Sequence, residues 1–170
     1  MFELKGRVAL VTGAGRNIGA GIARALARRG AAVAVNDFFA DRAESVAGEI
    51  RRTGAKAFAV PADVSDFPSV CRMVNETRSA LGPIDILVNN AGIPPTGMTP
   101  IKFREMPIED WDKYLKINLY GVLHCIKAVL DSMCERHWGR IITISSEGYR
   151  AGAGGMGLSL YSAGKAGAVG

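Results

Sequence analysis

The stretch "TGAGRNIG", residues 12–19, follows a short apolar run and precedes a segment with helical spacing. Its glycines permit a tight turn whose backbone can approach a ligand closely. Unpaired N–H groups and the dipole at the start of the following helix favour a bound phosphate. The spacing departs from G-x-G-x-x-G, because Ile18 stands in the third glycine position. The stretch predicts a phosphate-binding turn, with a purely structural turn as the alternative.

Short apolar runs alternate with helical patterns along the rest of the chain. Apolar strands separated by helices are typical of a parallel sheet that is covered on both faces. With right-handed crossovers, the pattern predicts an α/β fold, a doubly wound parallel sheet of the Rossmann type in three α/β/α layers. We expect one such domain over residues 1–170, with strands within 7–13, 31–37, 56–63, 84–92 and 139–146.

The predicted helices carry signals at their ends. Asp41 is expected to cap the second helix, and Ser65 or Asp66 the third. A long helical region over 108–137 is expected to be softened near Gly121. One stripe at helical spacing on the first helix consists of Ile18, Ile22, Ala25, Leu26 and Arg29.

The composition restricts the classes of function. A chain of 170 residues with 48% hydrophobic residues and 21 glycines suits a globular domain with a real core. Cys71, Cys125 and Cys134 lack metal-ligand spacing, which predicts reduced thiols in a cytoplasmic protein and no metal site. The net charge of +5 comes from scattered residues without a basic stripe, so we expect no nucleic-acid partner. We find no signal peptide or membrane span in the sequence.

The second predicted strand ends in Asn36 and Asp37. An acid about 20 residues beyond the glycine turn is placed to bind a ribose diol. Its carboxylate accepts two hydroxyl hydrogen bonds and repels a 2′-phosphate, so Asp37 favours NAD over NADP. Arg16 acts in the opposite direction, because a basic residue in the turn can meet that phosphate. The alternative is that Asp37 only caps the following helix.

Five motifs occur in a fixed order: "TGAGRNIG" (12–19), "NNAG" (89–92), Asn118 in "KINLYG", Ser146 in "IITISS" and "YSAGK" (161–165). Through them the chain resembles the short-chain dehydrogenases/reductases of the YxxxK type. The resemblance covers nearly the whole sequence. Each motif alone is weak, whereas five in this order are highly specific.

The resemblance implies an oxidoreductase that transfers a hydride between NAD(H), or less readily NADP(H), and a small secondary alcohol or ketone. It implies a homo-oligomer, either a dimer or a tetramer. The catalytic residues it implies are Asn118, Ser146, Tyr161 and Lys165. The cofactor-binding residues it implies are Gly13, Arg16, Asn17, Ile18, Gly19, Asp37, Asp63, Val64, Asn90, Ala91, Gly92, Tyr161 and Lys165.

The spacing of Tyr161 and Lys165 fits this chemistry, because residues i and i+4 are neighbours on a helix face. A free tyrosine has a pKa of about 10 and is a poor base at neutral pH. A nearby ammonium lowers that pKa, so Lys165 would activate the phenol. Ser146 would polarise the substrate oxygen, and Asn118 could anchor a water next to Lys165.

Some positions depart from the family pattern. Asn17 stands where the family has glycine or alanine, and asparagine tolerates the left-handed backbone such a turn requires. The interval from Ser146 to Tyr161 is slightly longer than expected, and the glycine-rich insert can absorb it. Ser145 is an alternative to Ser146, which is preferred because the family uses the second residue of the strand-end pair. Tyr149 is a weaker alternative to Tyr161, because no lysine follows it four residues later.

Two other functions stay open at this point. One is an NADPH-dependent 3-oxoacyl-thioester reductase of the same family, and the other is a dinucleotide-binding protein without catalysis. Substrate determinants are expected in the loops at 93–107 and 147–159. Family members continue beyond the YxxxK helix, so we expect the sequence to be partial. A chain ending at Gly170 would leave its last strand as an open edge.

Overall fold

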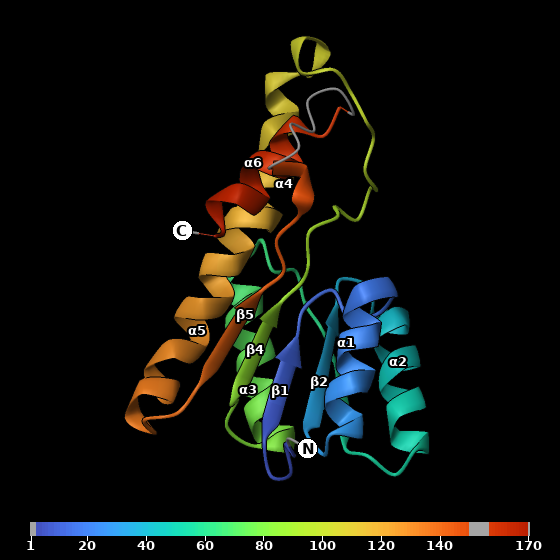
Figure 1. Cartoon of the computed structure of the whole chain (residues 1–170), viewed down its shortest axis with the longest axis vertical. Helices are drawn as coiled ribbons and strands as arrows, with labels where there is room; N and C mark the ends of the chain where they lie inside the picture. The colour runs from blue at the N-terminus through green and yellow to red at the C-terminus, as the bar shows by residue number, and fades with distance from the viewer. Residues whose placement is uncertain (1–2, 150–156, 170) are drawn as a thin grey trace.

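A parallel five-stranded sheet forms the centre of the computed structural model, which describes residues 3–149 and 157–169. The strand order is β3-β2-β1-β4-β5 (Figure 1). All four pairings are parallel, so the carboxyl ends of the strands meet at one edge. The strands are β1 (Val8–Val11), β2 (Ala32–Asp37), β3 (Ala57–Pro61), β4 (Ile86–Asn89) and β5 (Arg140–Thr143).

Helices cover both faces of the sheet, as Figure 1 shows. Helices α1 (Asn17–Arg28) and α2 (Ala40–Arg52) pack on one face, and α3 (Phe67–Leu81) and α5 (Gly121–Glu135) pack on the other. Helices α4 (Trp111–Leu115) and α6 (Ser159–Gly167) lie together beyond the carboxyl ends of the strands. This arrangement confirms the predicted three-layer, doubly wound fold.

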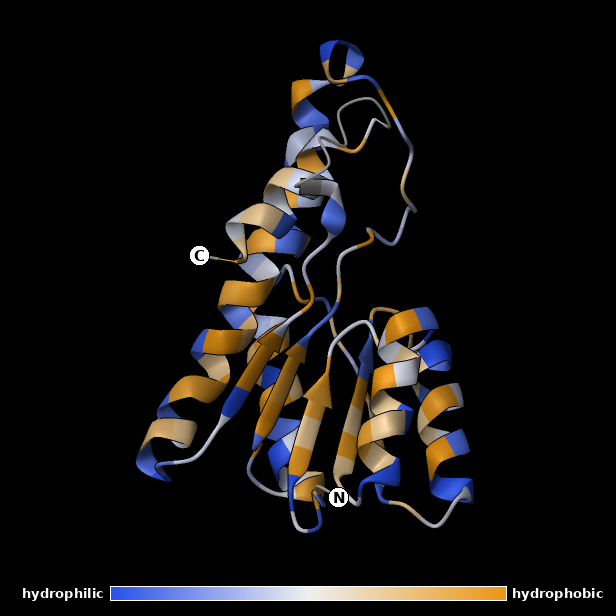
Figure 2. Cartoon of the chain, viewed as in Figure 1, coloured by the Kyte–Doolittle hydropathy of each residue, from blue (hydrophilic) through white to orange (hydrophobic). Residues whose placement is uncertain are grey.

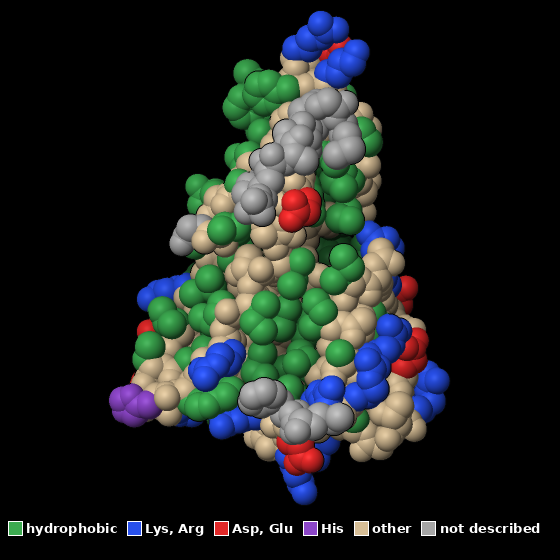
Figure 3. All heavy atoms as spheres, in the orientation of Figure 1, with side chains coloured by type: hydrophobic (Ala, Val, Ile, Leu, Met, Phe, Trp, Pro, Cys, Tyr) green, Lys and Arg blue, Asp and Glu red, His purple; other side chains and the backbone are tan. Residues whose placement is uncertain are grey.

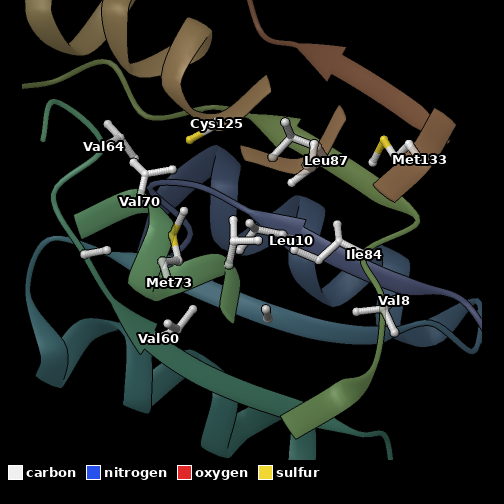
Figure 4. Packing of buried hydrophobic residues seen from close by; sticks show 14 of the residues in the cluster. Val8, Leu10, Val60, Val64, Val70, Met73, Ile84, Leu87, Cys125 and Met133 are labelled. Carbon is white, nitrogen blue, oxygen red and sulfur yellow. The ribbon is translucent and has the colours of Figure 1, made fainter. Parts of the chain in front are cut away.

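Two hydrophobic cores fill the spaces between the layers. Successive strand residues point to opposite faces, so Leu10 enters one core while Ala9 and Val11 enter the other. Figure 4 shows the first core, where Leu10 faces Met73 of α3 and lies near Cys125 of α5. The strands are hydrophobic along most of their length, as Figure 2 shows, which is expected of strands buried on both faces.

The face of α1 that meets the sheet differs from the prediction. Ile18 is 66% exposed, and the helix buries Gly19, Ala20, Ala23 and Ala27 instead. Small side chains allow the helix to pack closely against the first two strands. Ile22 and Leu26 are partly buried against the same core. The apolar stripe of the sequence therefore lies beside the true contact face.

The two predicted caps had different outcomes. The Asp66 side chain accepts a hydrogen bond from the Ser69 backbone N–H at 2.9 Å, so Asp66 caps α3 and Ser65 does not. The prediction for α2 was wrong, because its N-cap is Phe39 and Asp41 lies inside the first turn. An acid in that turn still interacts favourably with the helix dipole.

The long helical region of 108–137 is divided into pieces. A 3₁₀ turn (Ile108–Asp110) leads into α4, and a π-helical segment η3 (Lys116–Tyr120) connects α4 to α5. Two further 3₁₀ turns cover Phe103–Glu105 and Glu147–Tyr149. The predicted irregularity near Gly121 thus occurs in the five residues before it. Such π-segments are frequent at functional sites, and this one carries Asn118.

Strand β5 is the last strand in the sheet order, next to β4. Its first three residues are exposed, including Ile141 and Ile142. Figure 3 shows hydrophobic side chains gathered over β4 and β5 on the face in view. Among the helices of the described residues, none is long and apolar enough to cross a membrane.

Candidate active site

A cleft opens at the carboxyl edge of the sheet, where the strand order reverses between β1 and β4. Ligands of open α/β sheets bind at this position. Its volume of about 330 Å³ falls within the range of roughly 300–1,000 Å³ that is usual for small-molecule pockets. Every residue predicted to bind the cofactor lines this cleft, as do Ser145 and Ser146. Asn118 does not line it and lies behind it.

The glycine turn has the backbone that its sequence predicts. Gly13 has φ +59° and Asn17 has φ +48°, which confirms that asparagine adopts the left-handed conformation here. Gly19 has no space for a side chain, because a Cβ would lie 2.9 Å from the Ala14 Cα. The turn therefore brings backbone N–H groups to the start of α1, where a phosphate is favoured.

Asn90 and Thr12 hold the turn against the end of β4. The Asn90 Nδ2 donates to the backbone oxygens of Thr12 and Gly13 at 2.9 and 3.0 Å. The Thr12 Oγ1 accepts from the backbone N–H groups of Asn90 and Ala91 at 3.0 and 3.1 Å. These four bonds join β1 to β4 at the position where the cleft opens. The Asn90 amide is thus engaged in fixing the turn.

Asp37 places a buried carboxylate at the other side of the turn. The residue is 7% exposed, and its oxygens accept from the backbone N–H groups of Gly15 and Phe39, both at 3.1 Å. Gly15 is needed for this contact, since a Cβ there would lie 2.7 Å from the Asp37 Oδ2. The Phe39 bond closes a turn just before α2, whose N-cap is Phe39, so the alternative that Asp37 only caps this helix is wrong.

Two residues at this end were missed by the sequence reasoning. Arg42, in the first turn of α2, lines the cleft and places its guanidinium 4.1 Å from the centre of the Phe39 ring. Asn36 is 1% exposed, and its Nδ2 donates to the backbone oxygens of Val60 and Ala62. A buried asparagine requires partners, and its place at a strand end was the signal that could have identified it.

The segment after β3 forms one wall of the cleft and contains Asp63 and Val64, which were predicted to flank the adenine. The Asp63 Oδ1 accepts from both the backbone N–H and the hydroxyl of Ser65, at 2.8 and 2.7 Å. Val64 is buried, and its side chain packs against Gly121 at the start of α5. The wall is therefore a tight turn supported from behind by α5.

Lys165 is the only buried cationic side chain among the described residues, at 2% exposure. Its Nζ donates to the backbone oxygens of Ile144 and Ala91, at 2.9 and 3.4 Å. Burial lowers the pKa of the Lys165 ammonium to about 8. Tyr161 lies one helical turn earlier on α6 and lines the same cleft. A phenol and a desolvated ammonium thus share one helix face at the cleft.

Asn118 lies behind this pair in the π-helical segment. Its Nδ2 donates to the backbone oxygens of Gly92 and Tyr114 at 2.9 and 3.0 Å. Within the described part of the chain, its buried Oδ1 has no hydrogen-bond partner. A Cβ on Gly92 would lie 2.7 Å from that oxygen and 3.0 Å from the Lys165 Nζ. The Asn118 Oδ1 and the Lys165 Nζ therefore both lie next to Gly92, where there is no space for a side chain.

The two candidate serines have different partners. The Ser145 hydroxyl donates to the backbone oxygen of Lys165 at 3.2 Å, which ties β5 to α6. The Ser146 Oγ accepts from the Gly148 backbone N–H at 3.2 Å, and within the described residues its proton has no acceptor. This difference favours Ser146. The side chain of Tyr149 and most of the 147–159 loop lie outside the described residues.

No cluster of metal-ligating side chains occurs in the residues that the structure describes. The profile of the family called short chain dehydrogenase matches residues 7–170. This chain belongs to the short chain dehydrogenase family. Within that family, several curated proteins are similar over most of its length.

One relative, the (2S)-[(R)-hydroxy(phenyl)methyl]succinyl-CoA dehydrogenase subunit BbsD of Thauera aromatica, is 39% identical over 98% of this chain and 64% of its own. The 3-oxoacyl-[acyl-carrier-protein] reductase FabG of Staphylococcus epidermidis is 40% identical over 95% and 64%. A solved 7α-hydroxysteroid dehydrogenase, complexed with NADH and 7-oxo glycochenodeoxycholic acid, matches with a TM-score of 0.88 and 35% identity, covering 98% of this chain and 63% of its own. The chain therefore spans less than two thirds of these relatives.

Proposed function

We propose that this chain carries the cofactor-binding and proton-transfer part of an oxidoreductase that moves a hydride between NAD(H) and a secondary alcohol or carbonyl compound. One observation carries the proposal. Tyr161 and the buried Lys165 open onto the same cleft as the glycine turn. The phosphate-binding turn and the proton donor therefore serve one ligand-binding space. The similarity to the FabG reductase and to a hydroxysteroid dehydrogenase that was solved with NADH bound supports this class.

The residues present fit a dinucleotide along the carboxyl edge of the sheet. The turn from Gly13 to Gly19 would hold the pyrophosphate on backbone N–H groups. The Asp37 carboxylate would accept hydroxyls of the adenosine ribose. Asp63 and Val64 would flank the adenine, and Lys165 would hold the second ribose. The bound nicotinamide supplies the hydride chemistry.

The proton chemistry belongs to the chain's own residues. Tyr161 would donate its hydroxyl proton to the oxygen that becomes an alcohol, and would recover it in the reverse reaction. The Lys165 ammonium would stabilise the phenolate, because an opposite charge favours the ionised form. Ser146 would donate a hydrogen bond to the substrate oxygen. The unpartnered Asn118 Oδ1, facing Gly92 and Lys165, would hold a water that returns the proton from solvent.

NAD is the cofactor we propose, because Asp37 is buried and negatively charged at the ribose position. A 2′-phosphate there would meet like charge in a partly closed site. The second candidate is an NADPH-dependent 3-oxoacyl reductase. Arg16 and Arg42 favour it, since both line the cleft and Arg42 lies beside Gly15 together with Asp37, and so does the similarity to FabG. Because the cleft contains both a carboxylate and two cations, both cofactors must be compared.

Titration of the chain with NADH and with NADPH, followed by cofactor fluorescence, tests the binding proposal. We expect NADH to bind at least tenfold more tightly. Tighter binding of NADPH would favour the reductase alternative, and binding of neither would overturn the proposal. Consumption of NADH with a panel of ketones then separates an enzyme from a dinucleotide-binding protein without catalysis, which would bind NADH and turn nothing over.

We also propose a homo-oligomer that uses the outer face of α5. Leu123 and Leu130 are 51% and 40% exposed on this helix. Val122, Cys125 and Val129 face inward to the core, so the outward leucines are not needed for the fold of one chain. Sedimentation of the purified chain measures the state directly, and a single species of 18.0 kDa would contradict the proposal.

A further inference from the structure

His124 of α5 contacts the adenine-side wall of the cleft from behind. We propose that His124 is a positioning residue that fixes the segment 62–66 for the adenosine end of the cofactor. The inference rests on the proposed function, because it concerns the same cleft. It assigns a role to a residue that does not itself line the cleft.

The central contact joins the His124 Nδ1 and the Val64 backbone oxygen at 3.0 Å. A carbonyl oxygen can only accept, so Nδ1 carries the proton and donates. Gly121 lies one turn earlier on the same helix face and accommodates the Val64 side chain, since a Cβ there would lie 2.9 Å from the Val64 Cγ2. Two neighbouring positions of α5 thus hold both the backbone and the side chain of Val64.

The other bonds of this segment do not replace the His124 contact. The Asp63 carboxylate binds Ser65, and the Asp63 backbone N–H donates to the Ser69 hydroxyl at 3.2 Å. These bonds shape the turn from within. They connect it to the start of α3, and the bonds of Ala62 to Asn36 and Asp37 connect its first residue to β2. The His124 bond connects Val64 to α5. Val64 lines the cleft, so its orientation relative to the sheet decides the shape of the adenine wall.

Aromatic packing fixes the imidazole in this position. The His124 ring lies 5.4 Å from the Phe67 ring and 6.4 Å from the Tyr120 ring. Phe67 and Tyr120 are 38% and 52% exposed, so they limit the ring on its solvent side. Phe67 provides a matched control, because its replacement removes packing on the imidazole and leaves the bond to Val64.

The experiment compares His124→Leu, His124→Asn and Phe67→Leu by calorimetric titration with NADH and with AMP. Leucine removes the donor. The asparagine Nδ2 occupies nearly the position of Nδ1 and can donate the same bond. We expect His124→Leu to weaken both NADH and AMP about fivefold, which is the effect of one hydrogen bond. We expect His124→Asn and Phe67→Leu to stay within about twofold of the parent chain.

Two other results of this experiment would contradict the role of His124. Unchanged AMP affinity in His124→Leu would show that the bond does not serve the adenosine end. Equal losses in His124→Asn and His124→Leu would show that ring packing, and not donation, matters. Should His124→Leu fail to fold, the asparagine and Phe67 variants still decide between donation and packing. Absence of NADH binding in the parent chain would instead contradict the proposed function.

Discussion

The two ends of the cleft are constructed differently. At the glycine turn, the polar side chains of Thr12, Asn36 and Asn90 bond to backbone groups of neighbouring loops. At the Tyr161 end, the buried Asn118 Oδ1 has no partner among the described residues, and Lys165 carries a desolvated charge. A buried polar group without a partner costs free energy. The glycine turn is therefore held by several bonds to backbone groups, whereas the Tyr161 end retains the unpartnered Asn118 Oδ1, which a ligand or a water can use.

The substitution Tyr161→Phe is the strongest test of this difference between the two ends of the cleft. Removing the hydroxyl should reduce turnover by about 10³-fold, within the range for a general acid, while NADH affinity stays within about twofold. Stopped-flow turnover and fluorescence titration of the same preparation measure both quantities. Retained turnover would show that the proton comes from another group.

The charge of Lys165 should appear in the pH dependence of stability. Because its folded pKa is lowered to about 8 from 10.5, the unfolded chain binds more protons between these values. The contribution of Lys165 to the free energy of unfolding is therefore lowest below pH 8 and rises as the pH approaches 10.5. The rise should amount to about 3 kcal/mol. It should be absent in Lys165→Met, as measured by urea unfolding at several pH values, and identical pH profiles of the two chains would contradict it.

At the glycine turn, NADH affinity and stability should depend on the space available to side chains and not on charge. Gly19→Ala places a methyl group against the Ala14 Cα, where there is no space. We expect NADH affinity to fall by more than about tenfold and the midpoint of thermal unfolding to decrease. Gly21→Ala is the control, because nothing lies within 4 Å of a Cβ there. Equal effects of the two changes would mean that close packing at Gly19 is unimportant.

The smallest effect concerns cofactor preference. Asp37→Asn keeps the size of the side chain but removes the negative charge from the cleft that Arg16 and Arg42 also line. We expect NADPH affinity to increase about fivefold to tenfold relative to NADH, because like-charge repulsion is removed. Competition titrations with both cofactors measure the ratio. An unchanged ratio would place the control of preference on the two arginines.

Local patterns in the sequence predicted the features that depend on nearby residues. The Asp66 cap, the left-handed backbone at Asn17 and the strand–helix alternation all follow from side-chain chemistry within one or two turns. The stripe predicted on α1 does not coincide with its contact face, because apolar residues occur on several sides of this helix and do not reveal which side must approach the sheet. Helix packing depends on the partner surface, which the helix sequence does not contain.

The sequence by itself determined the family motifs, the tight glycine turn and the placement of Tyr161 and Lys165 on one helix face. Only the tertiary structure decided the roles of Asn36 and His124, because their hydrogen bonds reach across 24 to 60 residues of chain. It also decided the role of Arg42, which it places next to Gly15 of the turn. The tertiary structure also decided the pKa of Lys165. A lysine is charged in water by default, and the folded layers around Lys165 lower its pKa by removing that water.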